Sequence, residues 1–335
     1  MSFSLILPQK VIFGSGSIES IGGEAKRLGG RKVLIVTSPG MVRRAHLKQA
    51  TDSLKKHKLR FDVFSEVTPE PPIDDVYRCI SFARKKGSDL LIGLGGGSVM
   101  DVAKKAAADL ALPKIMVPTT AGTGSEVTHE SVLKVDGKKK AFVEAGLTAD
   151  VAIVDPNLCR TVSKRLVTSS AMDALAHAVE CYESKRSNPI AKTLAFEAFN
   201  LIKDNLMKAV KGNTQAMVNL SLGSLIAGMA FGNSGTTLGH ALSYPLSNRG
   251  ISHGEAVATV LPYALEFNGS DPAFAKNLRR LVRTIEFRWD QTWDADEMAA
   301  EVMEDTRHLV NNPVEVAFED VLGIFEKIRK ESHRR

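Results

Sequence analysis

Short apolar runs alternate with longer helical patterns through the first half of the chain. Runs that are apolar on both faces and rich in β-branched residues are typical of strands buried in a parallel sheet. The intervals between them leave room for crossover helices. The runs are KVIFGSG at 10–16, KVLIVTS at 32–38, FDVFSEV at 61–67, DLLIGLGGG at 89–97, KIMVPTT at 114–120 and DVAIVDP at 150–156. They predict a doubly wound α/β domain.

The pattern changes after DPNLCRTVS at 155–163. Strand-like runs give way to segments with apolar residues three and four positions apart, such as 190–210, which is typical of amphipathic helices. The second half is therefore predicted to be all-α. We place the boundary at Pro156, with one domain over 1–156 and a second over 157–335.

Composition narrows the class of protein. The 335 residues are 44% hydrophobic and can bury two cores. The net charge of +6 comes from lysines and arginines spread along the chain, which favours solvated faces over a nucleic-acid or membrane surface and suits an anionic cofactor. Three cysteines without CxxC spacing indicate a reducing compartment, so we expect a cytoplasmic protein. No uninterrupted apolar run is long enough to predict a membrane span.

A glycine-rich turn follows the fourth predicted strand. Gly95, Gly96 and Gly97 lead through Ser98 into an amphipathic segment. Glycines let a backbone approach a phosphate closely, and the N–H groups that begin a helix complement its negative charge. The turn lacks the full G-x-G-x-x-G pattern because Ser98 takes the last glycine place, so a purely geometric turn stays open as an interpretation.

A second polar loop, PTTAGTGSEVT at 118–128, follows the next strand. Parallel α/β sheets bind ligands at the carboxyl ends of their strands, where both loops are predicted to lie. The hydroxyls of this loop and the phosphate-binding glycines therefore predict one dinucleotide site. Its hydroxyl residues are Thr119, Thr120, Thr123, Ser125 and Thr128.

Four potential metal ligands lie in the second half. Asp173 and His177 are four residues apart in a helical segment, so both project from one face. His240 and His253 stand at the starts of two further apolar segments, separated by the turn-like SNRGIS. One carboxylate and three imidazoles suit Fe2+ or Zn2+. From spacing alone, satisfied core histidines remain the alternative, and that ordinary interpretation is given to His46, His57, His129, His308 and His333.

Together these motifs resemble the iron-containing, or group III, alcohol dehydrogenases. The resembling segments are GGGSVMDVAK at 95–104, PTTAGTGSEVT at 118–128, VAIVDP at 151–156, DALAHAVE at 173–180, GHALSYPL at 239–246 and HGEAVA at 253–258. The resemblance spans almost the whole chain.

The resemblance implies a Rossmann-like domain followed by a helical domain, with NAD(P)H in the cleft between them. It implies one divalent ion held by Asp173, His177, His240 and His253, which polarises a small alcohol or aldehyde while hydride passes to or from the nicotinamide C4. It further implies a homodimer or larger homo-oligomer, to which the first strand could add a sheet edge. The residues that match dinucleotide contacts of the family are Gly96, Gly97, Ser98, Asp101, Thr119, Thr120, Thr123, Thr128 and Lys139, with Lys140 as the alternative to Lys139.

Three departures from the family pattern bear on function. Tyr244 stands where many members carry a histidine that faces the substrate, which leaves a proton-relay role open. Ser38 replaces an acidic residue that NAD-preferring members use on the ribose, and Arg43 or Arg44 can pair with a 2′-phosphate, so we expect NADP(H) rather than NAD(H). The stretch between LPYALEFN and NNPVEVAF is shorter than usual, so part of the helical domain is expected to be trimmed.

Two other functions stay open as alternatives. Glycerol and glycerol-1-phosphate dehydrogenases and 3-dehydroquinate synthases share the architecture, although the last requires a dense basic pocket for its phosphorylated substrate. A non-redox nucleotide- or nucleic-acid-binding protein would group its basic residues on one face among aromatics, whereas only 6% of these residues are aromatic.

Overall fold

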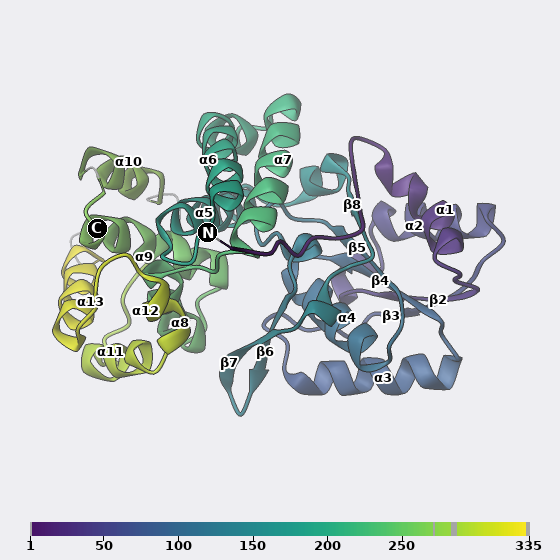
Figure 1. Ribbon diagram of the computed structural model, residues 1–335, viewed down its shortest axis with the longest axis horizontal. Helices are drawn as coiled ribbons and strands as arrows, with labels where there is room; N and C mark the ends of the chain where they lie inside the picture. Colours follow the sequence, from purple (N-terminus) through teal and green to yellow (C-terminus); the bar gives the residue numbers. More distant parts are fainter. Residues whose placement is uncertain (1, 271, 283–286, 333–335) are drawn as a thin grey trace.

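Six parallel strands form one sheet in the first half of the chain (Figure 1). A computed structural model describes residues 2–270, 272–282 and 287–332. The sheet order is β1-β8-β5-β4-β2-β3. The strands are β1 (Lys10–Phe13), β2 (Lys32–Val36), β3 (Arg60–Phe64), β4 (Leu90–Gly95), β5 (Lys114–Pro118) and β8 (Val151–Val154). All six coincide with the apolar runs that the sequence predicted, although β3 begins one residue before its run, at Arg60.

Helices cover both faces of this sheet. Val33 and Ile35 pack against α1 (Ile21–Arg27) and α2 (Ala45–Lys56). Leu34 and Val36 point to the opposite face, which α3 (Ile73–Lys86) and α4 (Gly97–Asp109) cover. This alternation follows from the two-residue period of a strand, and burial on both faces explains why the strands are apolar throughout.

The strand order reverses between β2 and β4. The chain leaves β2 toward β3 on one side, and leaves β4 toward β5 on the other. The two loops that follow β2 and β4 therefore diverge, and open α/β sheets bind their ligands in the crevice formed at such a point. Thr37, directly after β2, donates a hydrogen bond of 2.7 Å to the Leu94 carbonyl of β4, which fixes the two strand ends relative to each other.

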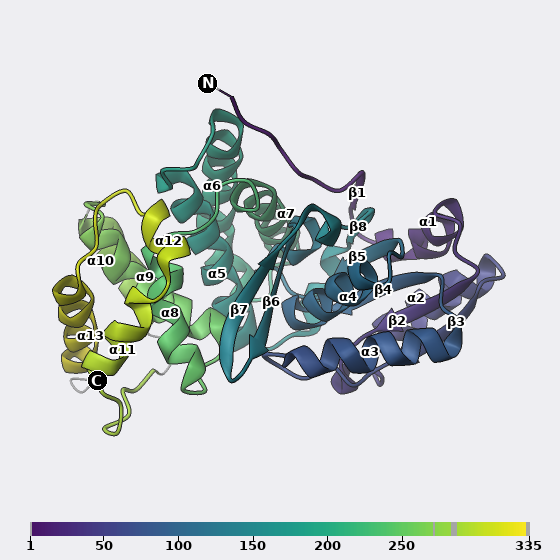
Figure 2. The same ribbon diagram turned by 60° about the horizontal axis from the view of Figure 1, so that its bottom comes forward.

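A β-hairpin that the sequence analysis missed projects from this domain. Strands β6 (Glu130–Val135) and β7 (Lys138–Val143) pair antiparallel through a turn at Asp136 and Gly137, both of which have positive φ. In Figure 2 the hairpin lies between the sheet and the helical part. Asp-Gly between alternating runs is a strong local hairpin signal, and it was available in the sequence.

The second half of the described chain contains only helices, as expected (Figure 1). Two large hydrophobic clusters hold it together, one formed mainly by α5, α6, α7 and α9, the other mainly by α8, α9, α11 and α13. A smaller cluster lies between α5, α6 and α7. Short 3-10 helices connect the elements of both halves at Ser17–Ser20, Pro39–Met41, Ser125–Val127, Ala145–Leu147 and Pro156–Thr161. The α-helices are α5 (Lys164–Glu183), α6 (Pro189–Val210), α7 (Thr214–Phe231), α8 (Leu238–Asn248), α9 (His253–Phe267), α10 (Pro272–Val282), α11 (Ala295–Met303), α12 (Thr306–Asn311) and α13 (Phe318–Ser332).

Helix α7 is long and apolar enough to meet a membrane-span criterion, with a mean hydropathy of 1.2 over its 18 residues. However, 61% of this window is buried inside the fold, where α7 packs against α5 and α6. Such burial is typical of a core helix.

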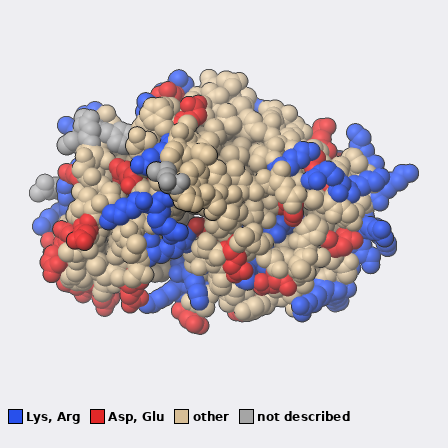
Figure 3. All heavy atoms as spheres, viewed as in Figure 1, with Lys and Arg blue, Asp and Glu red and all other residues tan. Residues whose placement is uncertain are grey.

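The N-terminal segment joins the two halves. From β1, at the sheet edge, the segment runs back to the helical domain (Figure 2). There the Ile6 amide donates a 2.7 Å hydrogen bond to Asn233 Oδ1, and the Asn233 amide donates back to the Ile6 carbonyl. On the face drawn in Figure 3, acidic and basic side chains are mixed, with basic ones densest at the end that carries α1 and α2.

Candidate metal and dinucleotide site

Four side chains converge where α5, α8 and α9 meet. Asp173 and His177 lie one turn apart on α5, His240 lies in the first turn of α8, and His253 is the first residue of α9. Asp173 Oδ1 is 3.8 Å from Nε2 of His177, 3.6 Å from Nε2 of His240 and 3.6 Å from Nε2 of His253. Nε2 of His177 and Nε2 of His240 are 3.1 Å apart.

These separations fit one small cation. Ligand atoms about 2.1 Å from a tetrahedral ion lie about 3.4 Å from one another. Among the described residues, Asp173 Oδ1 is buried without a hydrogen-bond donor, and a buried anionic oxygen left unpaired is costly. Asp173, His240 and His253 thus form a metal site, their ligand atoms lying within 4.8 Å of one another. The fourth predicted ligand, His177, falls outside this group of three, but its Nε2 lies close to both Asp173 and His240.

Glu180 orients one of these ligands, a role that could not be predicted from its place in the sequence. It is one further turn along α5, on the face of Asp173 and His177, and is buried. Its carboxylate accepts a hydrogen bond from Nδ1 of His240. Its Oε1 also accepts from the amide nitrogens of Thr237 and His240, each at 3.1 Å. With Nδ1 donating to Glu180, Nε2 of His240 carries the lone pair toward the metal position, as in carboxylate–histidine–metal arrangements.

The electrostatics hold three of the four ligands in the protonation states that bind a metal. Burial lowers the pKa of His177 to about 4 and holds the pKa of His253 well below its usual value, so both rings are neutral near pH 7. Burial alone would raise the pKa of Asp173, but the neighbouring histidines outweigh it and the pKa is lowered.

His240 differs from the other two histidines. Burial opposes its charged form, yet the Glu180 carboxylate raises the pKa of His240 to about 10. A proton on its Nε2 can bridge to Nε2 of His177, in the place where a cation would lie. Binding of a metal ion must therefore release a proton.

The metal site opens into a cavity of about 680 Å³ that reaches the loops after β2, β4 and β5. Its wall includes every predicted site residue except Gly95, which is buried at the end of β4. The predicted residues that line it are Ser38, Gly96, Gly97, Ser98, Asp101, Thr119, Thr120, Thr123, Thr128, Lys139, Asp173, His177, His240, Tyr244 and His253.

The glycine-rich turn approaches the threonine-rich loop closely. A Cβ on Gly97 would lie 2.7 Å from Cγ2 of Thr123, which is closer than side chains tolerate. A Cβ on Gly96 would meet nothing nearer than Thr120 Oγ1 at 3.5 Å. Gly97 is thus required by packing between the loops, whereas Gly96 keeps the backbone open to the cavity at the N-terminal end of α4. This end of a helix favours phosphate.

A buried lysine connects the two loops. Nζ of Lys104, which is fully buried on α4, donates to the Ser125 carbonyl at 2.9 Å and to Thr128 Oγ1 at 3.2 Å. Asp101 accepts from Ser125 Oγ at 2.6 Å and from the Val132 amide at 3.1 Å. Asp101 and Thr128 therefore line the cavity but are also held in an internal network.

Lys139 and Tyr244 lie next to each other in the cavity wall. Nζ of Lys139 pairs with Glu70 at 2.6 Å and lies 5.7 Å from the Tyr244 ring centre, whereas Lys140 lies over Phe142. Of the two lysines, Lys139 lines the cavity. Burial raises the pKa of the Tyr244 phenol, so its hydroxyl stays protonated near neutral pH and can donate a hydrogen bond but is a poor base.

His308 was assigned an ordinary structural role, yet its ring also lines the cavity. His46, His57 and His129 do not line this cavity, and His333 lies outside the described residues.

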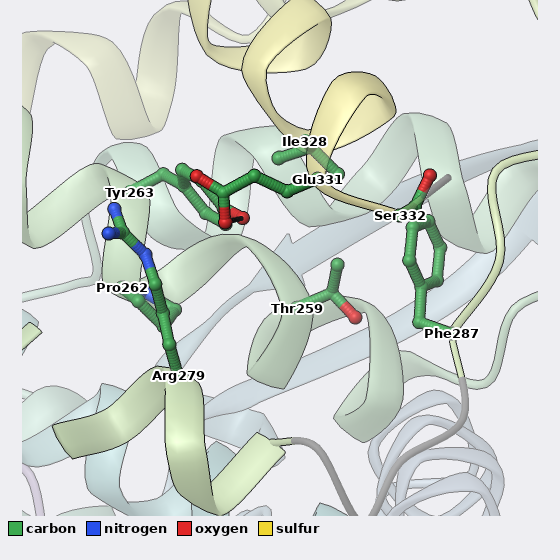
Figure 4. A pocket seen from close by; sticks show the side chains of 8 residues that line it. All are labelled: Thr259, Pro262, Tyr263, Arg279, Phe287, Ile328, Glu331 and Ser332. Atoms are coloured by element: carbon green, nitrogen blue, oxygen red, sulfur yellow. Dashed lines mark hydrogen bonds between the residues drawn. The ribbon is translucent and has the colours of Figure 1, made fainter. Parts of the chain in front are cut away.

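A second cavity, between α9, α10 and α13, is too small for a substrate (Figure 4). Its volume is about 20 Å³, roughly the room that one water needs. The Arg279 guanidinium lies 4.5 Å from the Tyr263 ring centre, and the Tyr263 hydroxyl donates to Glu331 at 2.9 Å. We interpret it as a packing gap within the helical domain.

Comparison with known proteins agrees with this site. Residues 8–156 match the family model described as iron-containing alcohol dehydrogenase, and 167–312 match that of the C-terminal part of the same family. The chain is 39% identical over 287 residues to the long-chain-alcohol dehydrogenase 1 of Geobacillus thermodenitrificans, covering 78% of this chain and 73% of that protein.

Solved structures show the same fold. An alcohol dehydrogenase from Oenococcus oeni superposes with a TM-score of 0.92 at 28% identity, covering 98% of this chain and 100% of that one. A sulfoacetaldehyde reductase from Bifidobacterium kashiwanohense in complex with NAD+ superposes with a TM-score of 0.90 at 30% identity, covering 98% and 99%. The chain therefore belongs to the iron-containing alcohol dehydrogenase family and is an NAD(P)-dependent alcohol dehydrogenase or aldehyde reductase.

Proposed function

We propose that this enzyme reduces small aldehydes with NADPH at one divalent ion, Fe2+ or Zn2+, held by Asp173, His177, His240 and His253. The observation that carries the proposal is the convergence of one carboxylate oxygen and three imidazole nitrogens on one point, at the wall of the cavity that also contains the glycine-rich turn. When bound, the ion supplies Lewis acidity toward the substrate oxygen and the nicotinamide supplies hydride.

The residues of this chain prepare the reaction by position and charge. Three neutral imidazoles with one carboxylate leave a bound divalent ion with net positive charge, which favours an oxygen that gains negative charge. Phe231 stacks on His177 with ring centres 3.9 Å apart and covers that side of the site. The Tyr244 hydroxyl, held protonated, is suited to donate a hydrogen bond to a substrate oxygen rather than to remove a proton.

Two features of the crevice support NADPH as the preferred donor. Ser38, after β2, lines the cavity where a carboxylate would repel a 2′-phosphate. Arg44 lines the same region, and its Nη1 donates to Thr161 Oγ1 at 3.2 Å, which holds the guanidinium near the crevice. Both arginines are exposed, but only Arg44 lines this cavity, so we assign the phosphate contact to Arg44.

The proposal extends to the cellular location and the assembly of the enzyme. Three free, buried cysteines support a reducing, cytoplasmic location. Strand β1 lies at the edge of the sheet, which supports pairing with a second copy of the chain.

A direct experiment tests the proposed activity. The purified enzyme should contain a divalent metal, and it should oxidise NADPH in the presence of simple aldehydes. Chelation should abolish turnover, and re-addition of Fe2+ or Zn2+ should restore it. Full turnover by the metal-free enzyme, or no turnover of any aldehyde or alcohol by the metal-loaded enzyme, would contradict the proposal.

A further inference from the structure

Two segments of this chain carry large charges of opposite sign. Residues 26–60 contain eleven Lys or Arg and one Asp, a net charge of +10 with histidine counted as neutral, although the whole chain has only +6. Residues 290–326 show the reverse, with eleven Asp or Glu and one Arg, a net charge of −10. The two segments are of similar length, and their charges cancel.

The fold places these segments at opposite ends of the molecule. The first includes the end of α1, β2, α2 and the start of β3, whereas the second includes α11 and most of α13. In Figures 1 and 2 the two groups of elements lie at the two ends of the long axis. Figure 3 shows basic side chains gathered at the first end and a group of acidic side chains at the lower corner of the second. The protein therefore has a basic pole and an acidic pole.

The basic pole consists of exposed cations that have no acidic partner within the described part of the chain. The last turns of α1 and α2 explain Lys26 and Lys56, because a cation stabilises that end of a helix. Lys32 and Arg60 have no such explanation, since they are register partners that begin two adjacent strands, where like charges repel each other. The residues of the basic pole are Lys26, Arg31, Lys32, Lys56, Lys58 and Arg60.

The acidic pole consists of exposed carboxylates on α11 and α13, two helices that pack against each other. Asp294 caps α11 by accepting hydrogen bonds from the amides of Asp296 and Glu297. Within the described residues, Glu297 reaches a base, Arg249, only at 3.8 Å. Acidic side chains in a first turn stabilise their helix, yet these carboxylates stay exposed and available for a second contact. The residues of the acidic pole are Asp294, Asp296, Glu297 and Glu319.

The charges match a second copy of this chain better than any other partner. Complementary charge fixes which surfaces meet, and each copy carries both complementary surfaces. A nucleic acid would pair with the basic pole but would leave the acidic pole unmatched. Among the described residues, α1, α2, β2, β3, α11 and α13 carry no exposed large apolar side chain, so neither pole offers an anchor for a membrane.

A contact between opposite poles is compatible with the rest of the molecule. The basic pole surrounds the amino ends of β2 and β3, whereas the dinucleotide crevice lies at the carboxyl ends of the strands. Strand β1 also stays free, because it lies at the opposite edge of the sheet from β3. The contact joins two different surfaces, so it extends into an open chain of copies unless the rotation between them closes a ring.

We propose that the basic pole of one copy binds the acidic pole of another, so that the protein assembles head to tail through ionic contacts. This inference goes beyond the proposed function and does not depend on it. Exposed charges act over about 30 Å at 0.01 M salt but only about 3 Å at 1 M. Assembly is therefore favoured at low salt and lost at high salt.

Sedimentation velocity of the metal-loaded enzyme at about 0.01 M and about 1 M salt tests the proposal. Species larger than the high-salt form should appear at low salt and grow with protein concentration. One triple variant reverses the basic pole, and a second reverses the acidic pole. Each alone should lose the low-salt assembly, whereas an equimolar mixture should regain it, because one variant then has two acidic ends and the other two basic ends. The substitutions are Lys32→Glu, Lys56→Glu and Arg60→Glu in the first variant, and Asp296→Lys, Glu297→Lys and Glu319→Lys in the second.

A matched control separates the poles from the net charge. Lys164→Glu, Lys208→Glu and Lys211→Glu change the net charge by the same amount as the basic-pole variant, at exposed positions on or next to α5 and α6. This control should assemble as wild type does. At high salt all variants should keep the wild-type kcat/KM with NADPH, which shows that they fold.

A second measurement requires no substitution. A carbodiimide joins a lysine to a carboxylate that it contacts, and Lys138 with Glu304, 2.9 Å apart within one chain, provides an internal control. Crosslinks from Lys56 or Lys58 to carboxylates of α11 should form at low salt and not at high salt. They report contact between copies, because these groups lie at opposite ends of one chain (Figure 1).

The results that overturn the proposal are specific. One is a sedimentation profile that is the same at low and high salt, and another is low-salt assembly that survives reversal of either pole. A mixture of the two reversed variants that stays unassembled, or a control variant that loses assembly, also overturns it. If the reversed variants do not fold, the presence or absence of the pole-to-pole crosslink in wild type decides the question.

Discussion

The carboxylate of Glu180 accepts a hydrogen bond from Nδ1 of His240 and thereby turns Nε2 of the same ring toward Asp173, whose Oδ1 is 3.6 Å away. The same carboxylate binds the amide nitrogen of His240. One buried side chain thus fixes both the ring and the backbone of a metal ligand. The metal site therefore depends on this contact as well as on its ligands.

Replacing Glu180 with glutamine should weaken metal binding about 10- to 100-fold, because the ring loses the anion that fixes its tautomer. The measurement is metal affinity in competition with a chelator at pH 7. Glu183→Gln is a matched control on the same helix, since Glu183 bonds to Asn268 and Ser270 away from the ligands. Equal affinities in wild type and Glu180→Gln would show that Glu180 does not orient His240.

Adding one methyl group at Gly97 should weaken dinucleotide binding. Gly97→Ala places a Cβ 2.7 Å from Thr123 Cγ2, so the loops must separate, at an overpacking cost of about 1–3 kcal/mol. If the loops bind the dinucleotide, part of this energy must be recovered from NADPH binding. Because about 1.4 kcal/mol corresponds to a tenfold change, NADPH affinity should fall about tenfold or more. Fluorescence titration measures this affinity. Gly323→Ala, in α13, adds its Cβ where nothing lies within 4 Å and should leave the affinity unchanged. Unaltered NADPH affinity in Gly97→Ala would show that the dinucleotide does not bind at these loops.

Cofactor preference should depend on Arg44. Arg44→Ala should lower kcat/KM with NADPH about tenfold, since a charge-assisted bond to the 2′-phosphate is lost, and change kcat/KM with NADH little. Arg43→Ala, at the neighbouring exposed position, should leave both values near wild type. A wild-type preference for NADH, or parallel losses with both donors in Arg44→Ala, would contradict the NADPH proposal.

Stability should fall with rising pH because of Glu126. Burial raises the pKa of this carboxyl from 4.5 to about 7 in the folded chain, although Lys104 acts in the opposite direction. The folded state therefore holds the proton more tightly than the unfolded state. This contribution to stability is present below pH 4.5, and it is lost as the pH rises to about 7.

Over this window the free energy of unfolding should fall by about 3 kcal/mol more in wild type than in Glu126→Gln, which cannot ionise. Denaturant unfolding of both metal-free proteins at several pH values measures the difference. Parallel stability curves for the two proteins would mean that Glu126 ionises normally in the fold.

Much of the fold could be predicted because its signals are local. The six strands of the sheet are short apolar runs, and the spacing of Asp173 and His177 already placed both on one helical face. The hairpin at 130–143 was missed although its Asp-Gly turn is a local signal, because its alternating runs are half-polar rather than fully apolar.

The remaining parts of the site depend on tertiary contacts. Glu180 shares the helical face of the ligands, yet only the approach of α8 shows that it bonds to His240. The sequence around His308 does not indicate that this side chain lines the cavity, because no local pattern brings α12 to the cavity wall. Ion pairs between the hairpin and the segment around α12 lie beside it, and they too join residues far apart in the sequence.

The metal content of His240→Ala, measured by elemental analysis beside wild type, tests the central claim most directly. Wild type should contain about one divalent ion per chain, and the variant should contain almost none and have no turnover, while NADPH binding stays nearly intact because the loops after β4 and β5 are unchanged. Full metal occupancy or retained turnover in His240→Ala would contradict the account.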